Sequence, residues 1–353
     1  MADRVSCDWR GLAVVPHCLD RDAGRAVSAD IERNAGTGGP EFVASSSPRA
    51  LERCLRIISV PLDIVLFQEH QSSRKAAVPF GHSYNPEMQK TVSDDADIFY
   101  DVAGAGPPVV LLHPFPVNHE FWLPITKYLA PRYRLIMPDL RGHGDSGLGD
   151  GPATMQKHAV DVARIMSDAG ADRAPLIGVS IGGYTIFEFW RRFRDRVSGL
   201  VLCNTKASAD TADARAGRLK AADDVLQNGR ESFFEGMLQK VLAESTRQLR
   251  PDLVEGALRM MRRMSAEDIA GVQRGMAERP DSVSTLKTIT ERVLIITGDE
   301  DSVTGVPEAE IMKQNIAGSQ VKVISKAGHY SPWEQPEEVG KLLRQFLDSM
   351  ASY

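Results

Sequence analysis

From about residue 90 onward, short runs of apolar residues alternate with segments whose apolar residues recur at helical spacing. Continuous runs such as Val109–Leu112 are typical of central strands in a parallel sheet. Asp97–Val102 alternates instead, like an early antiparallel strand. The predicted strands are 97–102, 109–112, 134–137, 175–179, 199–203, 293–296 and 321–324, with helices at about 122–129, 153–169, directly after 180, and 336–350. This order predicts an α/β fold with a mostly parallel, doubly wound sheet.

The segment between Cys203 and Val293 departs from this alternation, because it contains no strand-like run. Its periodic pieces predict helices at about 212–226, 232–242, 253–264 and 267–276. The segment is rich in methionine, with Met237, Met260, Met261, Met264 and Met276. Ordinary helix packing accounts for such residues. The functional alternative is a lid, 207–287, whose flexible thioethers suit varied apolar ligands.

Residues 1–87 differ from the rest of the chain. They mix Gly, Ser, Asp and Arg without a sustained period, apart from 49–67, which could form one short helix and one strand. We therefore predict a largely disordered extension, followed by one enzyme domain at 88–353. A further hypothesis is that Met88 is the natural start, because everything that a complete enzyme domain needs follows it.

Composition and charge narrow the class of protein. The net charge of −5 gives no reason to expect nucleic acid or an anionic membrane as a partner. The four cysteines form no C-x-x-C pair, which indicates neither a disulfide framework nor a zinc site and favours a reducing, cytoplasmic location. The N-terminus lacks the order of a secretory signal, and the apolar run 55–67 is too short and polar to span a bilayer.

A glycine-flanked serine, Ser180, follows the predicted strand at 175–179. Gly178 and Gly182 surround it in the pattern G-x-S-x-G. A sharp turn from strand to helix would push the serine oxygen out at the top of a sheet. The flanking residues must be small, because strand and helix nearly touch there. The pattern predicts a nucleophile elbow, and the alternative is a Gly-rich turn with a solvated serine.

A serine nucleophile needs a base and an acid that orients the base. His329 lies in a Gly-flanked loop after the last predicted strand, at the sheet edge where sites form. The acidic turn 298–301 follows the preceding strand. We predict Asp301 as the triad acid and expect Asp299 to bond the loop backbone, with Asp299 as the alternative acid. The order Ser180, Asp301, His329 is the nucleophile–acid–base order of one fold in particular.

An oxyanion hole is predicted at the turn 113–116, which reads His-Pro-Phe-Pro. Proline has no N–H group, so Phe115 is the donor between two prolines. The second donor would be the N–H of Ile181, at the start of the helix behind Ser180, where the helix dipole favours a developing anion. Each donor stabilises the transition state by about 3 kcal/mol.

Two other features have structural interpretations. Residues 142–147 match G-x-G-x-x-G, but a dinucleotide site requires the glycines to open a helix directly, and 149–152 still contains two glycines and a proline. We therefore expect a surface turn there and no nucleotide cofactor. The histidines are scattered without metal-ligand spacing, so no metal is predicted. His119 and Glu120 could reach a pocket rim or could be polar residues at a helix start.

The chain resembles the α/β-hydrolase superfamily from about residue 88 to 353. The matching motifs are 111–116 with Trp122, 139–146, 178–183, 298–301 and 328–329. The commoner form of the first motif has Gly at Pro114, yet the family's donor position falls on Phe115. Segments 202–207 and 275–282 are similar to bacterial esterases related to 3-oxoadipate enol-lactonase. The resemblance implies a sheet of the α/β-hydrolase type with a helical lid after the sixth strand.

These features together predict a cofactor-independent serine hydrolase that cleaves a small carboxylic ester or lactone through an acyl-enzyme. Ser180 would attack, His329 would transfer the proton and Asp301 would hold the imidazole, with the N–H groups of Phe115 and Ile181 binding the oxyanion. A serine C–C bond hydrolase or a cofactor-free perhydrolase could use the same residues. A ligand-binding receptor or scaffold with slow turnover is the alternative from another class.

Overall fold

The computed structural model describes residues 18–20, 25–27 and 88–350, and the chain divides into two compact units, Met1–Gly81 and His82–Tyr353. In the first unit, strand β1 (Cys18–Asp20) pairs antiparallel with β2 (Arg25–Val27). The helix and strand predicted within 49–67 lie outside the described residues, as does most of the extension predicted to be disordered.

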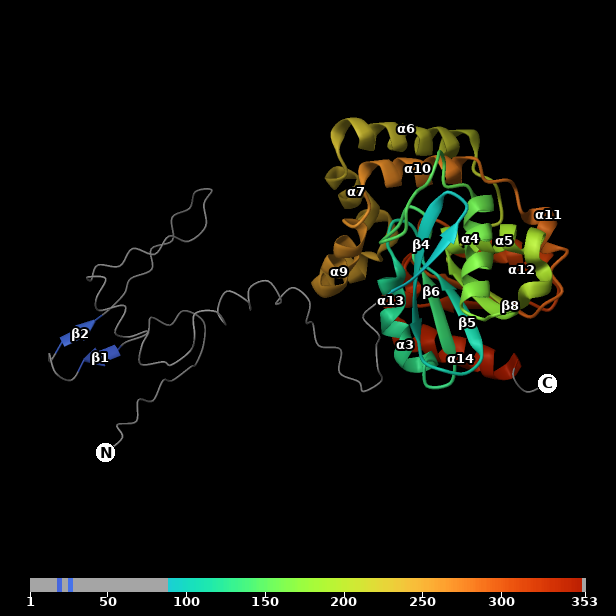
Figure 1. The fold of residues 1–353 in the computed structure, drawn as a ribbon, viewed down its shortest axis with the longest axis horizontal. Coiled ribbons are helices and arrows are strands. Elements are labelled where there is room, and N and C mark those ends of the chain that lie inside the picture. The colour runs from blue at the N-terminus through green and yellow to red at the C-terminus, as the bar shows by residue number, and fades with distance from the viewer. Residues whose placement is uncertain (1–17, 21–24, 28–87, 351–353) are drawn as a thin grey trace. The chain divides into compact units, whose positions relative to one another are not determined.

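The second unit is built on an eight-stranded sheet (Figure 1). Its strands are β3 (Gln89–Ser93), β4 (Ala96–Ala103), β5 (Pro108–Leu112), β6 (Arg134–Pro138), β7 (Ala174–Val179), β8 (Val197–Cys203), β9 (Val293–Gly298) and β10 (Gln320–Ile324). Their order across the sheet is β10-β9-β8-β7-β5-β6-β4-β3. Strand β4 pairs antiparallel with both β3 and β6, and the other neighbouring strands of this sheet pair in parallel. The predicted mostly parallel sheet is confirmed, and all seven predicted strands are present.

Helices connect the strands and cover the sheet. They are η2 (His119–Trp122), α3 (Leu123–Leu129), α4 (Met155–Asp168), α5 (Ile181–Phe193), η3 (Arg194–Arg196), α12 (Gly305–Asn315), α13 (Ser331–Glu334) and α14 (Pro336–Met350). Helix α3 packs against α14, and α4 packs against α5 (Figure 1). Within the residues described, no helix is long and apolar enough to cross a membrane.

Six helices, which we call the helical insert, lie between β8 and β9. They are α6 (Ala212–Asn228), α7 (Glu231–Val241), α8 (Glu244–Leu249), α9 (Pro251–Met261), α10 (Ala266–Ala277) and α11 (Val283–Leu286). Figure 1 shows α6 lying along α10, and the two helices pack closely. The four predicted helices are confirmed. Helices α8 and α11 were not predicted, because each is too short to show a helical repeat of apolar residues.

The elements missed in the rest of the domain share a weak hydrophobic signal. Strand β3 is at the edge of the sheet, and its inward positions are the polar residues Thr91 and Ser93. Helix α12 buries only Ala309 and Met312. The central strands are different, since all six residues of β9 are buried and were readable as an apolar run. Burial on both faces therefore explains why the central strands were predicted, whereas β4 was predicted from its alternating pattern.

Candidate active site

Ser180 occupies a strained turn between β7 and α5. Its backbone has φ of 54° and ψ of −113°, a region that side chains rarely adopt outside functional turns. The Ser180 N–H donates toward the carbonyls of Cys203 and Asn204, at 3.2 and 3.1 Å. The Thr205 hydroxyl donates to the Ser180 carbonyl at 2.8 Å. Strand β8 and the residues after it thus hold the turn that presents the serine.

The two flanking glycines are required by close backbone contacts. A Cβ atom at Gly178 would lie 2.5 Å from the carbonyl carbon of Gly182. A Cβ at Gly182 would lie 2.5 Å from the carbonyl oxygen of Leu112 in β5. Real Cβ atoms do not come this close to backbone atoms. The close approach of strand and helix predicted from the sequence is confirmed.

His329 and Asp301 meet at the carboxyl edge of the sheet, each 8% exposed or less. The His329 Nδ1 atom lies 3.0 Å from Oδ2 and 3.1 Å from Oδ1 of Asp301. Asp301 also accepts hydrogen bonds from the backbone N–H groups of Val303 and Thr304 and from the Thr304 hydroxyl. Burial raises the pKa of Asp301, but His329 and the side-chain donors of Asn204 and Thr304 outweigh burial and hold that pKa well below its usual range. The carboxylate is therefore ionised beside the ring.

Asp299, the alternative acid, faces away from His329. Its side chain accepts from the backbone N–H of Ala327 and from the Ser325 hydroxyl, both at 3.3 Å. Asp299 is exposed, whereas Asp301 is buried. The structure therefore brings Asp301 and not Asp299 into contact with the histidine.

The backbone N–H groups of Phe115 and Ile181 have no hydrogen-bond acceptor within the described part of the chain. Phe115 lies in the turn after β5, and Ile181 is the first residue of α5. The Tyr330 hydroxyl donates to the carbonyl oxygen of Phe115 at 2.9 Å. Tyr330 adjoins His329, so one buried side chain links the histidine loop to the Phe115 turn.

Asn204 connects three loops of the site and was not singled out as a site residue from the sequence. Its side-chain amide donates to Asp301 Oδ2 at 2.9 Å and to the Gly328 carbonyl at 3.1 Å. Its side-chain oxygen accepts from the Ser331 hydroxyl at 2.5 Å, and its backbone carbonyl accepts from Ser180. The signal that could have revealed it is its place directly after the buried strand β8.

Glu334 joins the histidine loop to the helical insert. One carboxylate oxygen accepts the N–H of Gly328 at 2.9 Å, and the other accepts the N–H of Ala243 at 2.8 Å. A Cβ atom at Gly328 would lie 2.5 Å from the backbone nitrogen of Ala243. The loop that carries His329 is therefore packed directly against the insert.

A cavity of about 480 Å³ opens above these residues. Ser180, His329, Phe115 and Val303 line it from the sheet side. Helices α6, α7 and α10 line the other side with Ala214, Gly217, Arg218, Ala221, Ser232, Phe233, Gly236, Met237, Lys240, Val241, Gln273 and Met276. The volume is in the range of small-molecule sites, about 300–1,000 Å³. Two of the insert's methionines face the cavity, while Met260, Met261 and Met264 are buried in the core.

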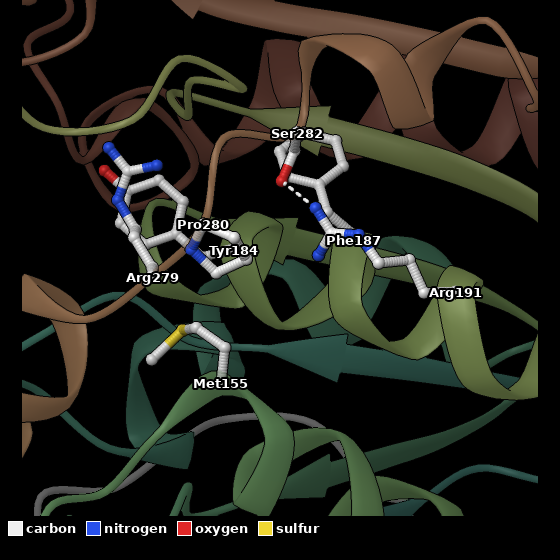
Figure 2. Close-up of a pocket in the computed structure, with 7 residues that line it drawn as sticks. All are labelled: Met155, Tyr184, Phe187, Arg191, Arg279, Pro280 and Ser282. Atoms are coloured by element: carbon white, nitrogen blue, oxygen red, sulfur yellow. Dashed lines mark hydrogen bonds between the residues drawn. The ribbon is translucent and has the colours of Figure 1, made fainter.

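Tyr184 of α5 lines this cavity and also a small crevice, which Figure 2 shows. In the crevice, Arg279 lies over the Tyr184 ring, with the guanidinium carbon 4.2 Å from the ring centre. Figure 2 shows Arg191 donating to the Ser282 hydroxyl at the other end. The crevice has no room for a water molecule. It is therefore part of the packing around Tyr184 and holds no ligand.

The remaining sequence features are structural. Gly142 and Gly144 form a turn, and α4 begins only at Met155, so the predicted turn is present. Its expected place at the surface is wrong in part, because Gly142, His143 and Ser146 are buried. His119 is buried against Asp139, with 2.7 Å between His119 Nδ1 and Asp139 Oδ1, and does not line the cavity. Among the described residues, no three His, Cys, Asp or Glu side chains are grouped so that they could hold a metal ion.

The sequence and fold match known proteins. Residues 107–336 match the family described as the alpha/beta hydrolase fold. A Bacillus subtilis protein described provisionally as a 2-succinyl-6-hydroxy-2,4-cyclohexadiene-1-carboxylate synthase is 31% identical over 74% of this chain and 98% of its own length. A 3-oxoadipate enol-lactonase of Acinetobacter baylyi is 27% identical over 69% of this chain and 90% of its own.

Among solved structures, a thermophilic esterase from Thermogutta terrifontis, determined with malate bound, is 34% identical. It superposes with a TM-score of 0.72 and covers 75% of this chain and 99% of its own. The resemblance to esterases related to 3-oxoadipate enol-lactonase is thus confirmed. The matched residues 107–336 include every candidate site residue from Phe115 to His329. The chain therefore belongs to the alpha/beta hydrolase fold family and is an α/β-fold hydrolase.

Proposed function

We propose that this protein hydrolyses a carboxylic ester or lactone, with Ser180 as nucleophile, His329 as base and Asp301 as the orienting acid. The observation that carries the proposal is the convergence of these groups at one cavity: Ser180 and His329 line it, and Asp301 bonds His329 Nδ1. A histidine held through Nδ1 has its Nε2 atom available as a base.

The proposed reaction has two steps. His329 removes the Ser180 proton as the serine oxygen attacks the carbonyl, and then returns it to the departing alcohol, which leaves an acyl-enzyme. Water attacks the acyl-enzyme with His329 again as base. The unpartnered N–H groups of Phe115 and Ile181 bind the oxyanion in both steps, aided by the N-terminal end of α5.

The relatives support an ester or lactone as substrate. The Acinetobacter relative is named an enol-lactonase and the Thermogutta relative an esterase. In this chain, Met237, Met276 and Phe233 line the cavity on the insert side, which suits an acyl group with apolar surface. We therefore expect the substrate to bind between the insert and the sheet edge.

The test is hydrolysis of p-nitrophenyl esters and lactones of graded chain length by the wild-type chain and by Ser180→Ala. The variant should lose about 10⁵–10⁶-fold in turnover, because the remaining groups cannot replace the nucleophile. A fluorophosphonate should label the wild-type chain at Ser180 only. Near-normal ester hydrolysis by Ser180→Ala would overturn the proposal.

A synthase activity is the second candidate, because the 31% identical Bacillus relative carries a synthase name. The ester panel distinguishes the two. A synthase would label with fluorophosphonate and yet leave every ester and lactone uncleaved, whereas a hydrolase would turn over at least one class.

A further inference from the structure

The cavity wall on the insert side carries two cations and no carboxylate. Arg218 of α6 and Lys240 of α7 both line the cavity. None of the residues lining it is an aspartate or a glutamate. The rest of that wall is small, apolar or uncharged. The cavity therefore has a positive end on the insert and the candidate nucleophile Ser180 on the sheet.

Lys240 is free to bind an anion. Within the described part of the chain, no carboxylate lies within ion-pair distance of its ammonium group. The helix that carries it also supplies Phe233 and Met237 to the same cavity. Lys240 is exposed to solvent, so its attraction to an anion is a screened charge–charge interaction that weakens as ionic strength rises.

Arg218 belongs to a cluster with more cations than anions. Its Nε atom donates to Asp210 Oδ2 at 2.6 Å, and Nη1 lies 3.2 Å from the Gln273 side-chain oxygen. The same Asp210 carboxylate also pairs with Arg279 at 2.9 Å and with Lys206 at 3.1 Å. One carboxylate thus forms ion pairs with three cations. The Nη2 atom of Arg218 has no hydrogen-bond partner among the described residues.

Arg279 adds to this positive field from behind the cavity wall. It lies over the face of Tyr184, and the same tyrosine lines the cavity. The Nε atom of Arg279 is buried and has no hydrogen-bond partner among the described residues. Asp210 thus holds Arg218 and Arg279 in place and is the one carboxylate with which they form ion pairs among the described residues.

We propose that Arg218 and Lys240 form an anion-binding subsite, so that the preferred substrate is an ester or lactone bearing a second, ionised carboxylate. The statement that the bound compound is cleaved at Ser180 rests on the proposed function. The carboxylate would lie against α6 and α7 while the scissile carbonyl lies at Ser180. A guanidinium fixed by Asp210 can bind a carboxylate with little loss of side-chain entropy, and the more mobile Lys240 adds a point charge.

The test uses the full-length chain and compares its hydrolysis of two p-nitrophenyl esters of equal length. One is the hemiglutarate, and the other replaces its free carboxylate with a methyl ketone. The rate of Ser180→Ala is subtracted as the blank. The wild-type kcat/KM should favour the hemiglutarate by about tenfold or more at low salt, and the preference should shrink as ionic strength rises.

Substitutions test whether Arg218 and Lys240 cause the preference for the hemiglutarate. Lys240→Met, and more strongly the pair Arg218→Met with Lys240→Met, should lower the hemiglutarate-to-ketone ratio of kcat/KM toward one, mainly through KM. Lys220→Met is the control: Lys220 lies on α6 with Arg218, is highly exposed, pairs with Asp224 and does not line the cavity. The control should keep the wild-type ratio. A wild-type ratio of one or less would overturn the subsite and leave ester hydrolysis standing.

A binding measurement separates the subsite from catalysis. Glutarate should bind the wild-type chain and Ser180→Ala equally by calorimetry, and about tenfold or more weaker to Lys240→Met, while the neutral glutaramide should bind none of them measurably. If no ester is cleaved yet glutarate binds in this pattern, the proposed function fails and the subsite stands. Absence of glutarate binding overturns the subsite.

Discussion

The side-chain amide of Asn204 donates to both the Asp301 carboxylate and the Gly328 carbonyl, at 2.9 and 3.1 Å. Gly328 directly precedes His329, so this one amide fixes the acid relative to the histidine loop. Asn204 also has a positive φ of 40°, which asparagine tolerates better than most residues. We infer that Asn204 is a positioning residue for the proposed triad.

Replacing Asn204 should therefore reduce activity without removing a catalytic group. Asn204→Gly accommodates the positive φ but deletes both hydrogen bonds, and Asn204→Asp keeps the shape but places a second carboxylate beside Asp301. Both should lower kcat/KM by about 10²-fold, because small misplacements at a reacting site cost about that much. Fluorophosphonate should still label Ser180, more slowly. Wild-type kinetics in folded Asn204→Gly would contradict the positioning role.

The choice between the two aspartates is testable by the same substitution at each. Asp301→Asn removes the charge that holds the His329 ring and should lower kcat by about 10⁴-fold, as loss of the orienting acid does in serine hydrolases. Asp299→Asn changes an exposed side chain that bonds Ser325 and Ala327, and its kcat should stay within about threefold. Equal losses in the two variants would show that the acid has been misassigned.

The tight contact at the elbow predicts a stability effect. Gly182→Ala places a methyl group against the carbonyl oxygen of Leu112, and should lower the free energy of unfolding by about 1–3 kcal/mol or more. Gly217→Ala is the matched control, since Gly217 also lies in a helix and a Cβ there meets nothing within 4 Å. The control should stabilise the chain by up to about 1 kcal/mol. Urea unfolding of both variants measures the difference, and equal effects would contradict the close approach.

Three buried histidines predict a loss of stability in acid. Burial lowers the pKa of His113 to about 3 and of His143 to about 4, and lowers the pKa of His158 well below its usual value. Each stays neutral in the fold while the unfolded chain takes up a proton below pH about 6.5. Their contribution to stability is therefore complete above pH about 6.5 and is lost as the pH falls toward the folded pKa values.

His158→Leu isolates one of these contributions. Both ring nitrogens of His158 are buried and have no hydrogen-bond partner in the part of the chain that the structure describes, so leucine should not destabilise the chain at neutral pH. Below pH about 6, the variant should gain stability over wild type by about 1.4 kcal/mol per pH unit. Urea unfolding from pH 7 down to pH about 4.5 measures this gain. Parallel curves for the two proteins would contradict the neutral, buried state of His158.

Local patterns in the sequence were sufficient for the elbow and the central strands. Gly178, Ser180 and Gly182 lie within five residues of the chain, and the turn they form depends on the small size of the two glycines. The strands β5, β7, β8 and β9 are buried on both faces, so each appears as a continuous apolar run. Features whose cause lies within a few residues were therefore predictable.

Only the tertiary structure distinguished groups with the same local pattern. Asp299 and Asp301 stand in one acidic turn, and the direction of the chain after β9 decides which of them contacts His329. His119 and His329 each bond a buried carboxylate, yet only His329 lines the cavity. A side chain's direction depends on the elements that pack around it, which sequence spacing does not record.

The charge of the cavity is likewise a property of the assembled fold. Arg218 and Lys240 lie on separate helices of the insert. Asp210 forms ion pairs with Lys206, Arg218 and Arg279, which are far apart in the sequence. The sequence by itself determined an α/β sheet with a glycine-flanked serine and a late histidine. The tertiary structure decided that Asn204 joins their loops and that the cavity above them is positive, because both depend on contacts between residues distant in the chain.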